Sequence, residues 1–194
     1  MIKIDNDIKN LKLEVLERVA KLAFDGDLDA DHLAQIPFEM IPTTRPRFRC
    51  CVYKEREILS QRTRMATGKL PTGVEDHGAV ISVIPSACEG CPINRYRVTE
   101  NCQRCLAKKC QEACPFGAIS MTGKGAYIDP DKCRECGRCA QACPYNAIAD
   151  LVRPCKRSCP VGAISIQEDK VAVIEQDKCI SCGACMRDCP FGAI

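Results

Sequence analysis

The sequence predicts an α+β fold in which a helical N-terminal region precedes small modules of strands and loops. Three observations lead to this prediction. The pattern C-P-x-x-A-I occurs four times between residues 114 and 194. Each pair of copies encloses a short apolar segment that is typical of a strand. The first 24 residues instead carry apolar side chains at helical spacing.

Two helices are predicted near the N-terminus, on either side of a stretch that contains several prolines. Apolar side chains recur at helical spacing from residue 5 to about residue 24. Between residues 37 and 46 the prolines are expected to break any helix. A second helix is predicted from residue 52 to about residue 67, and Gly68 ends it. These segments make up a helical region predicted over residues 1–85.

The four C-P-x-x-A-I copies come in two pairs, which indicates two duplicated modules. Their starts are 29 residues apart in the first pair and 30 in the second, with 16 residues between the pairs. Each pair also contains a related segment, GAYIDPDKC at 125–133 and VAVIEQDKC at 171–179, which is predicted to enter a cysteine loop as a strand. We therefore predict a complete module at 102–150 and a second module at 151–194, with 86–101 as a linker.

The second module is expected to lack its closing strand, because the chain stops at Ile194, directly after the last copy of the pattern. A strand-like run such as Ser165-Ile166 follows the earlier copies. The sequence is therefore expected to be a fragment, or the front part of a longer protein.

The number of cysteines, 18 among 194 residues, indicates a covalent or metal framework. The N-terminus lacks the apolar core of a secretory signal peptide, so a cytoplasmic location is expected. No stretch approaches about 18 uninterrupted apolar residues, so no segment is expected to span a membrane. Because thiols stay reduced in the cytoplasm, the cysteine pattern favours metal sites over disulfides.

Two cysteine runs, which start at Cys133 and Cys179, have the spacing C-x-x-C-x-x-C-x-x-x-C-P. This is the ligand pattern of bacterial ferredoxins with 4Fe-4S clusters, in which the fourth cysteine of each run binds the other cluster of the pair. A run that starts at Cys102 differs only in its middle gap, which holds four residues instead of two. The sequence thus predicts two tandem bacterial-ferredoxin-like modules, each of the two-cluster type.

Four sets of cluster ligands follow from these runs. The sets are Cys102, Cys105, Cys110 and Cys143; Cys133, Cys136, Cys139 and Cys114; Cys179, Cys182, Cys185 and Cys159; and Cys88, Cys91, Cys155 and Cys189. The fourth set is incomplete within its own module, so the separate C-x-x-C of Cys88 and Cys91 is predicted to supply two ligands. A zinc site or a pair of free thiols remains the alternative for that pair.

The other cysteines and the two histidines are not predicted to bind metal. Cys50 and Cys51 are expected to be small buried apolar residues. His32 and His77 are expected to be ordinary surface or loop residues. The sequence contains no phosphate-binding loop, catalytic triad or dinucleotide fingerprint, so no catalytic site is predicted in this chain.

The formal charge of +3 is expected to change sign when clusters bind. At about −2 for each cluster with its thiolates, four clusters contribute about −8 and leave about −5. The whole chain is therefore not expected to bind nucleic acid, although an iron-sulfur protein that binds it through a local basic segment is an alternative. Two interpretations of that segment are open. It forms a solvated face of the protein, or its arginines face the anionic clusters or the acidic surface of a partner. The arginines are Arg45, Arg47, Arg49, Arg56, Arg62 and Arg64.

Four segments of the chain carry a family resemblance. They are PRFRCCVYKEREI at 46–58, IPSACEGCPINRY at 84–96, NCQRCLAKKCQEACPFGAISMTG at 101–123 and RPCKRSCPVGAI at 153–164. Together they resemble the N-terminal region of group B iron-iron hydrogenases. The parts RCCVYKERE and CEGCPINR lie outside the ferredoxin runs and carry most of this resemblance. In that family a catalytic domain with the hydrogen-activating cluster follows the cluster domain.

The predicted function is electron transfer through several 4Fe-4S clusters. The resemblance implies a relay between a soluble carrier such as ferredoxin and a hydrogenase active site beyond residue 194. The alternative is a stand-alone polyferredoxin or an electron-transfer subunit of another redox enzyme.

Overall fold

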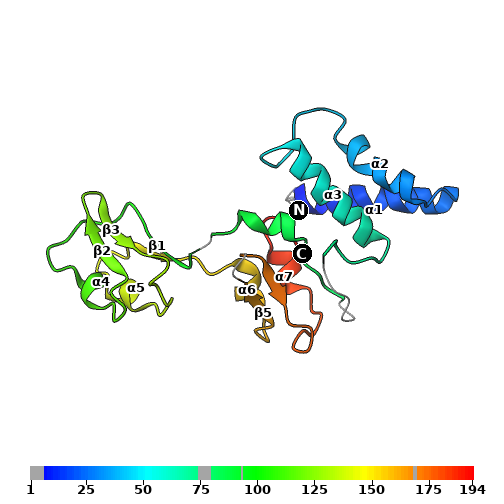
Figure 1. Ribbon diagram of the computed structural model, residues 1–194. Coiled ribbons are helices and arrows are strands. Elements are labelled where there is room, and N and C mark those ends of the chain that lie inside the picture. The colour runs from blue at the N-terminus through cyan, green and yellow to red at the C-terminus, as the bar shows by residue number, and fades with distance from the viewer. Residues whose placement is uncertain (1–6, 74–79, 93, 168–169) are drawn as a thin grey trace, which may run out of the picture. The chain divides into compact units, whose positions relative to one another are not determined.

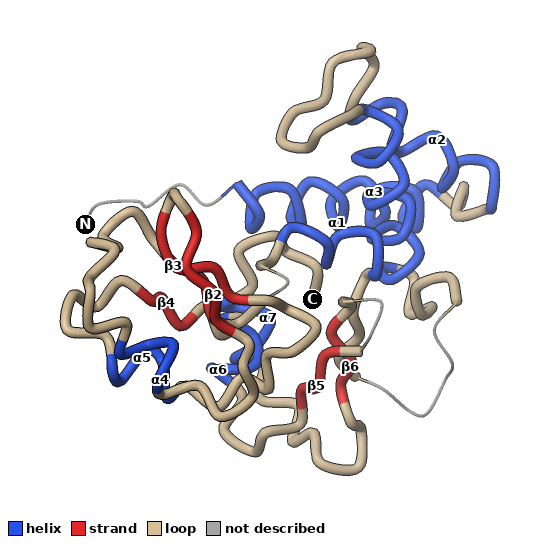
Figure 2. The backbone as a smooth tube through the Cα atoms, turned by 60° about the vertical axis from the view of Figure 1, so that its left-hand side comes forward, coloured by secondary structure: helices blue, strands red, loops and turns tan. Residues whose placement is uncertain are grey.

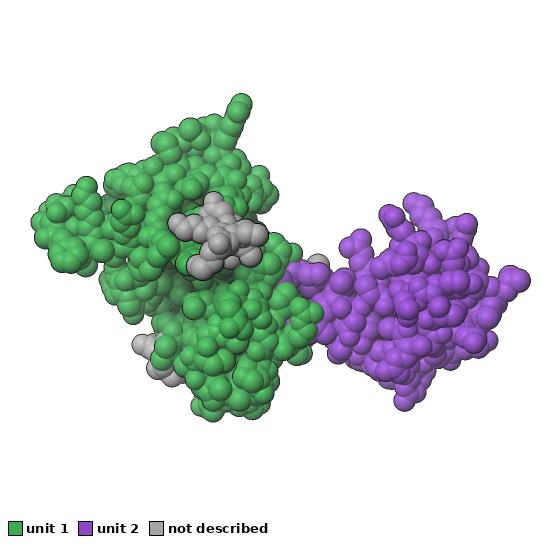
Figure 3. Space-filling view, turned by 180° about the vertical axis from the view of Figure 1, so that it is seen from behind, with its two compact units in different colours: residues 1–90, 154–194 green, residues 91–153 purple. Residues whose placement is uncertain are grey.

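The computed structural model describes residues 7–73, 80–92, 94–167 and 170–194. The chain divides into two compact units, one of residues 1–90 and 154–194 and the other of residues 91–153 (Figure 3). The first unit holds the N-terminal helices together with the second predicted module, and the other unit holds the first module. The described elements are helices and small sheets, which confirms the mixed α and β composition.

Three helices form the N-terminal part of the chain: α1 (Asp7–Asp25), α2 (Ala30–Met40) and α3 (Val52–Ala66) (Figure 1). The helices predicted at 5–24 and 52–67 are confirmed as α1 and α3, although residues 5 and 6 lie outside the described residues. The three helices share one core. Its buried side chains are Leu11, Val15, Val19, Ile36, Met40, Ile41, Val52 and Leu59.

The prediction that Pro37 would break a helix is wrong, because α2 continues through Pro37 to its end at Met40. At the start of α2, the Asp29 side chain accepts a hydrogen bond from the backbone N–H of His32 at 2.8 Å and caps the helix. Proline removes one hydrogen bond from a helix. Burial of Ile36, Pro37 and Met40 offsets this loss.

The strands are short and pair as three antiparallel two-stranded sheets (Figure 2). The pairs are β1 (Tyr96–Val98) with β4 (Ile148–Asp150), β2 (Ile119–Thr122) with β3 (Gly125–Ile128), and β5 (Ile164–Ile166) with β6 (Ala172–Ile174). The strands predicted at the start of segments 125–133 and 171–179 are therefore confirmed as β3 and β6. The rest of each segment forms the turn that leads into a cysteine loop.

Short helices carry the cysteines or lie next to them. These are the 3-10 helix η1 (Pro85–Gly90), α4 (Lys109–Glu112), α5 (Arg138–Ala142), α6 (Pro154–Ser158) and α7 (Ala184–Asp188). η1 packs against α3 within one unit. Among the helices in the described residues, none is long and apolar enough to cross a membrane.

A backbone contact is repeated in the two units. Thr99, directly after β1, donates its N–H to the carbonyl of Ala147 at 2.8 Å, and Ile84 donates to Ala193 at 2.7 Å. Ala147 and Ala193 hold the same position in C-P-x-x-A-I, so the segment before η1 takes the place of β1 in the second module. The predicted linker at 86–101 thus contains most of η1 and all of β1.

Candidate metal centres

Two cysteine-lined cavities occupy corresponding places in the repeat, one in each unit. The first is lined by Tyr96, Cys114, Phe116, Ala118, Ile119, Ile128, Cys133, Arg134, Cys136, Gly137 and Cys139. The second is lined by Ile81, Cys159, Val161, Ala163, Ile164, Ile174, Cys179, Ile180, Cys182, Gly183 and Cys185. After the first residue, the two lists match position for position in the repeat. Each cavity contains one complete predicted ligand set.

The donor chemistry of these cavities fits a 4Fe-4S cluster. Each cavity presents four cysteine sulfurs, and its other lining side chains are mostly apolar. In the part of the chain that the structure describes, no three His, Cys, Asp or Glu side chains gather around a point that could hold a single metal ion. The four cysteines of each set are instead distributed over the wall of their cavity.

The four C-P-x-x-A-I turns orient their cysteines in the same way. In each turn the backbone N–H of the alanine donates a hydrogen bond to the sulfur of the cysteine. The N···S distances are 3.3 Å for Ala118 and Cys114, 3.3 Å for Ala147 and Cys143, 3.2 Å for Ala163 and Cys159, and 3.3 Å for Ala193 and Cys189. Such hydrogen bonds favour the thiolate, which is the form that binds iron.

The set of Cys102, Cys105, Cys110 and Cys143 lies together in the unit of residues 91–153. Burial raises the pKa of the Cys110 thiol, and repulsion from Cys143, Cys102 and Cys105 raises it further. The Cys110 sulfur is therefore within electrostatic range of the other three. The backbone N–H of Ala126 in β3 donates to the Cys102 sulfur at 3.5 Å, and this bond lowers the pKa of Cys102.

Three cysteines of the fourth set lie in the core of the other unit. Cys88, Cys155 and Cys189 are buried there, with exposed fractions of 6%, 5% and 8%. The N–H of Ala172 in β6 donates to the Cys88 sulfur at 3.4 Å, which repeats the bond from Ala126 to Cys102 in the first module. Ala172 and Ala126 hold the same position in the strand repeat. Cys91 is half-buried and is the first residue of the unit 91–153.

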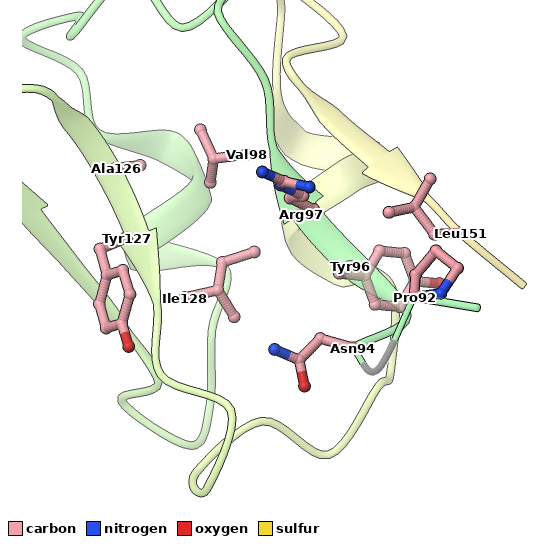
Figure 4. Close-up of a pocket in the computed structure, with 9 residues that line it drawn as sticks. All are labelled: Pro92, Asn94, Tyr96, Arg97, Val98, Ala126, Tyr127, Ile128 and Leu151. Atoms are coloured by element: carbon pink, nitrogen blue, oxygen red, sulfur yellow. The ribbon is translucent and has the colours of Figure 1, made fainter. Parts of the chain in front are cut away.

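Sequence reasoning missed Tyr96, although this residue ends the CEGCPINRY segment. Tyr96 lines the first cysteine cavity, and its hydroxyl donates a hydrogen bond to Oδ2 of Asp150 at 3.2 Å. Tyr96 also lines an open pocket together with Tyr127 of β3 (Figure 4). Pairing of β1 with β4 places this ring in the same core as Cys139, and the spacing of residues gives no sign of that contact.

Alanine at Gly137 is expected to loosen the first cavity more than alanine at Gly183 loosens the second. Both glycines have a left-handed backbone, with φ of +79° and +73°, so both substitutions cost about 1–2 kcal/mol. A Cβ on Gly137 would also lie 2.7 Å from the Tyr96 hydroxyl, whereas a Cβ on Gly183 meets only Met186 Cε at 3.9 Å. The rate of iron release to a chelator, compared with wild type for each variant, tests this. Equal acceleration in the two variants would contradict the role given to Tyr96.

The predicted burial of the adjacent pair Cys50 and Cys51 is wrong. Cys50 is exposed and Cys51 is half-buried. The Cys51 sulfur accepts a hydrogen bond from the N–H of Lys54 at 3.5 Å and caps the start of α3, a role that the burial statistics of cysteine do not indicate. His32 is exposed and bonds to Asp29, as expected for a surface residue, and His77 lies outside the described residues.

The interpretation of the basic segment as one solvated face holds for Arg45, Arg47 and Arg64, which are exposed, but not for Arg62. Arg47 forms an ion pair with Glu14 at 2.9 Å. Arg49 Nη2 donates a hydrogen bond to the carbonyl of Phe191 at 2.6 Å, and Arg62 is buried. Two arginines of the segment therefore approach the fourth C-P-x-x-A-I turn. This placement favours the alternative interpretation, in which arginines of the segment face an anionic cluster.

Known proteins match the cysteine modules. The protein family described as "4Fe-4S dicluster domain" matches residues 101–147 and 153–193. The protein "Ferredoxin 7Fe" of Hydrogenibacillus schlegelii is 42% identical over 53 residues, which cover 27% of this chain and 68% of that relative. This chain belongs to the 4Fe-4S ferredoxin family. It binds 4Fe-4S clusters.

Other relatives of this ferredoxin-family chain match it over only part of their own length. A "Ferredoxin" of Saccharopolyspora erythraea is 43% identical over 53 residues, 27% of this chain and 50% of the relative. The "Electron transport protein HydN" of Escherichia coli is 38% identical over 53 residues, 27% of this chain and 30% of the relative. The chain thus spans half of the first relative and less of the second. Cys88 and Cys91 lie outside both stretches matched as dicluster domains.

Proposed function

We propose that this ferredoxin-family chain is the cytoplasmic electron relay of an iron-iron hydrogenase. In this proposal electrons pass from a soluble carrier such as ferredoxin, through four clusters, to an active site beyond residue 194. The observation that carries the cluster part of the proposal is the position-for-position match between the two cysteine-lined cavities. It supports the second and third ligand sets, in which each run binds the last cysteine of its partner run.

The first and fourth sets have separate support. The electrostatic coupling of Cys110 to Cys102, Cys105 and Cys143 supports the first set. The equivalent bonds from Ala172 to Cys88 and from Ala126 to Cys102 support Cys88 as the counterpart of Cys102. By its spacing from Cys88, Cys91 would then correspond to Cys105.

The chain's own residues prepare these sites for electron transfer. A bound 4Fe-4S cluster takes up and releases one electron at a potential that nearby hydrogen bonds, charges and burial adjust. The cysteines hold the cluster, and the alanine N–H groups of the C-P-x-x-A-I turns stabilise charge on four of the sulfurs. Apolar side chains such as Ile119 and Ile164 line the cavities and limit the access of water.

The hydrogenase part of the proposal is supported by the two segments that resemble that family outside the ferredoxin runs. RCCVYKERE covers the loop before α3 and the first half of α3, and CEGCPINR begins in η1. α3 and η1 pack together in one unit. The helix that begins within the first segment therefore packs against the helix in which the second segment begins, and Ile58 of α3 shares a core with Cys88 of η1.

The relay is tested with the natural protein, including everything its gene encodes after residue 194. Alanine at Cys136, a predicted ligand of the second set, is expected to reduce hydrogen evolution from reduced ferredoxin to background. Hydrogen–deuterium exchange at the active site needs no external electron and should persist. Cys50→Ala is the matched control, because Cys50 is exposed and belongs to no ligand set.

Two outcomes would contradict the relay proposal. If the natural protein accepts electrons from ferredoxin but neither evolves hydrogen nor catalyses the exchange, the stand-alone polyferredoxin or the subunit of another redox enzyme is the better description. If Cys136→Ala keeps full ferredoxin-driven hydrogen evolution, electrons do not pass through the second ligand set.

A further inference from the structure

The fourth C-P-x-x-A-I turn, residues 189–194, is held by cationic side chains from the N-terminal helices. Lys12 Nζ donates a hydrogen bond to the carbonyl of Ile194 at 2.7 Å. Arg49 Nη2 donates to the carbonyl of Phe191 at 2.6 Å. In the other three turns, the three residues after the cysteine are exposed, whereas here they become progressively buried. The turn that carries Cys189 is thus covered on a side where its counterparts face solvent.

Arg62 of α3 also lies against this turn and is the most deeply placed of the cations. It is 8% exposed, and its Nη2 lies 3.0 Å from the position that a Cβ on Gly192 would occupy. Among the described residues, Nε and Nη2 of Arg62 are buried and have no hydrogen-bond partner. A buried guanidinium without a partner is costly, so a nearby negative charge is expected.

The positive charges lie close enough to act on one another. Burial and repulsion from Arg49 lower the pKa of Arg62 to about 10, so Arg62 still carries its charge at neutral pH. Burial and repulsion from Arg62 lower the pKa of Lys12. Interaction with the Cys189 sulfur acts in the opposite direction on both groups. Lys12, Arg49 and Arg62 thus gather around the turn that carries Cys189.

Carboxylates in the pocket that Arg62 lines offset only part of this positive charge. Glu55 is buried and lines that pocket, and its carboxylate accepts hydrogen bonds from the backbone N–H groups of Arg47 at 2.7 Å and Phe48 at 3.2 Å. Asp7 lines the same pocket as Arg62 at the start of α1. Among the described residues, the three cations Lys12, Arg49 and Arg62 exceed the two carboxylates of Asp7 and Glu55 by one charge.

We propose that Lys12, Arg49 and Arg62 balance the charge of the cluster bound at Cys189 and raise its reduction potential. The inference rests on the fourth ligand set of the proposed function. A cluster with four thiolates carries about −2 and gains another negative charge on reduction, so nearby cations stabilise the reduced form more than the oxidised form.

Burial of the fourth set makes this compensation necessary. Cys88, Cys155 and Cys189 are buried, whereas their counterparts Cys102, Cys110 and Cys143 are half-buried. Burial disfavours added negative charge and by itself would make the fourth centre harder to reduce. Arg104, which interacts with Cys102 in the first module, is exposed, so water screens its charge more than that of Arg62.

The test is a redox titration of the cluster-loaded protein, followed by electron paramagnetic resonance. Comparison with Cys88→Ala, which should lack the fourth centre, identifies its signal. In Arg62→Met the midpoint potential of that signal is expected to fall by at least about 59 mV, a tenfold shift in the one-electron reduction equilibrium. Arg62→Lys keeps the charge and should stay closer to wild type. Arg64→Met is the matched control, because Arg64 is exposed on the same helix and donates to the carbonyl of Leu70.

The possible outcomes separate this inference from the proposed function. An unchanged midpoint in Arg62→Met, in protein with about 16 iron atoms per chain, would overturn the charge-balancing role and leave the ligand set intact. A wild-type protein with about 12 iron atoms would mean that the fourth centre itself does not exist. If Arg62→Met does not fold, Lys12→Met, at a half-buried position, should show a smaller fall, and no fall there would also overturn the inference.

Discussion

Alanine at Cys189 is expected to remove the same cluster that alanine at Cys88 removes, even though the two residues are a hundred positions apart in the sequence. Four clusters correspond to about 16 iron and about 16 acid-labile sulfide atoms per chain after anaerobic reconstitution, and each single variant should retain about 12 of each. The reason is that the last cysteine of a run binds the partner cluster rather than the cluster of its own run.

Double variants test this exchange of ligands between runs by the number of iron atoms that remain per chain. Cys88→Ala with Cys189→Ala affects one site twice and should still leave about 12 iron atoms. Cys182→Ala with Cys189→Ala affects two sites and should leave about 8 iron atoms. If each run instead bound its own cluster, the two counts would be exchanged. Quantitative metal and sulfide analysis distinguishes these results without knowledge of any partner protein.

The first module supplies the matched control for this experiment, because its ligand runs are more complete. Cys102→Ala with Cys143→Ala should leave about 12 iron atoms, and Cys136→Ala with Cys143→Ala should leave about 8. If the first module behaves in this way but Cys88→Ala changes no iron count, Cys88 and Cys91 are not cluster ligands. Zinc lost in Cys88→Ala would then favour the four-cysteine zinc alternative.

The repeat made much of the site predictable from sequence. Cysteines three positions apart are held close together by covalent geometry, and the ferredoxin pattern assigns to them the last cysteine of the partner run, so the sequence predicted the cysteines that line the two cavities. The apolar residues that begin the related segments GAYIDPDKC and VAVIEQDKC predicted the strands β3 and β6, because this is also a local pattern. Structure that is set by neighbouring residues in the sequence can be predicted without knowledge of the tertiary contacts.

Features that depend on tertiary contacts were not predictable in this way. Pro37 lies inside α2 because burial of its helix face offsets one lost hydrogen bond, and sequence gives no measure of that burial. The basic segment had two interpretations because charge alone does not tell which face of a helix will be covered. Lys12 was missed because its partner, the carbonyl of Ile194, is 182 residues away in the sequence.

Alanine at Ile58 is expected to destabilise the core of the second module, whereas alanine at its neighbour Leu59 is expected to destabilise the core of the N-terminal helices. Both side chains are fully buried, with exposed fractions of 1% and 0%, so each substitution should cost about 2–5 kcal/mol. The two side chains point into different cores. Leu59 belongs to the core of the three N-terminal helices, and Ile58 belongs to the core that contains Cys88, Cys155 and Cys189.

The different cores predict different kinetics of cluster loss. In Ile58→Ala a cavity opens beside the buried cysteines, so iron from the third and fourth ligand sets should reach an anaerobic chelator faster than in wild type. Leu59→Ala should lower the stability of the helices by a similar amount with a smaller effect on iron release. Iron from the clusters of residues 91–153, a separate compact unit, should leave at the wild-type rate in both variants. Equal acceleration by Ile58→Ala and Leu59→Ala would mean that α3 protects the second module only by being folded, and that the contact of Ile58 with the cysteine core adds nothing of its own.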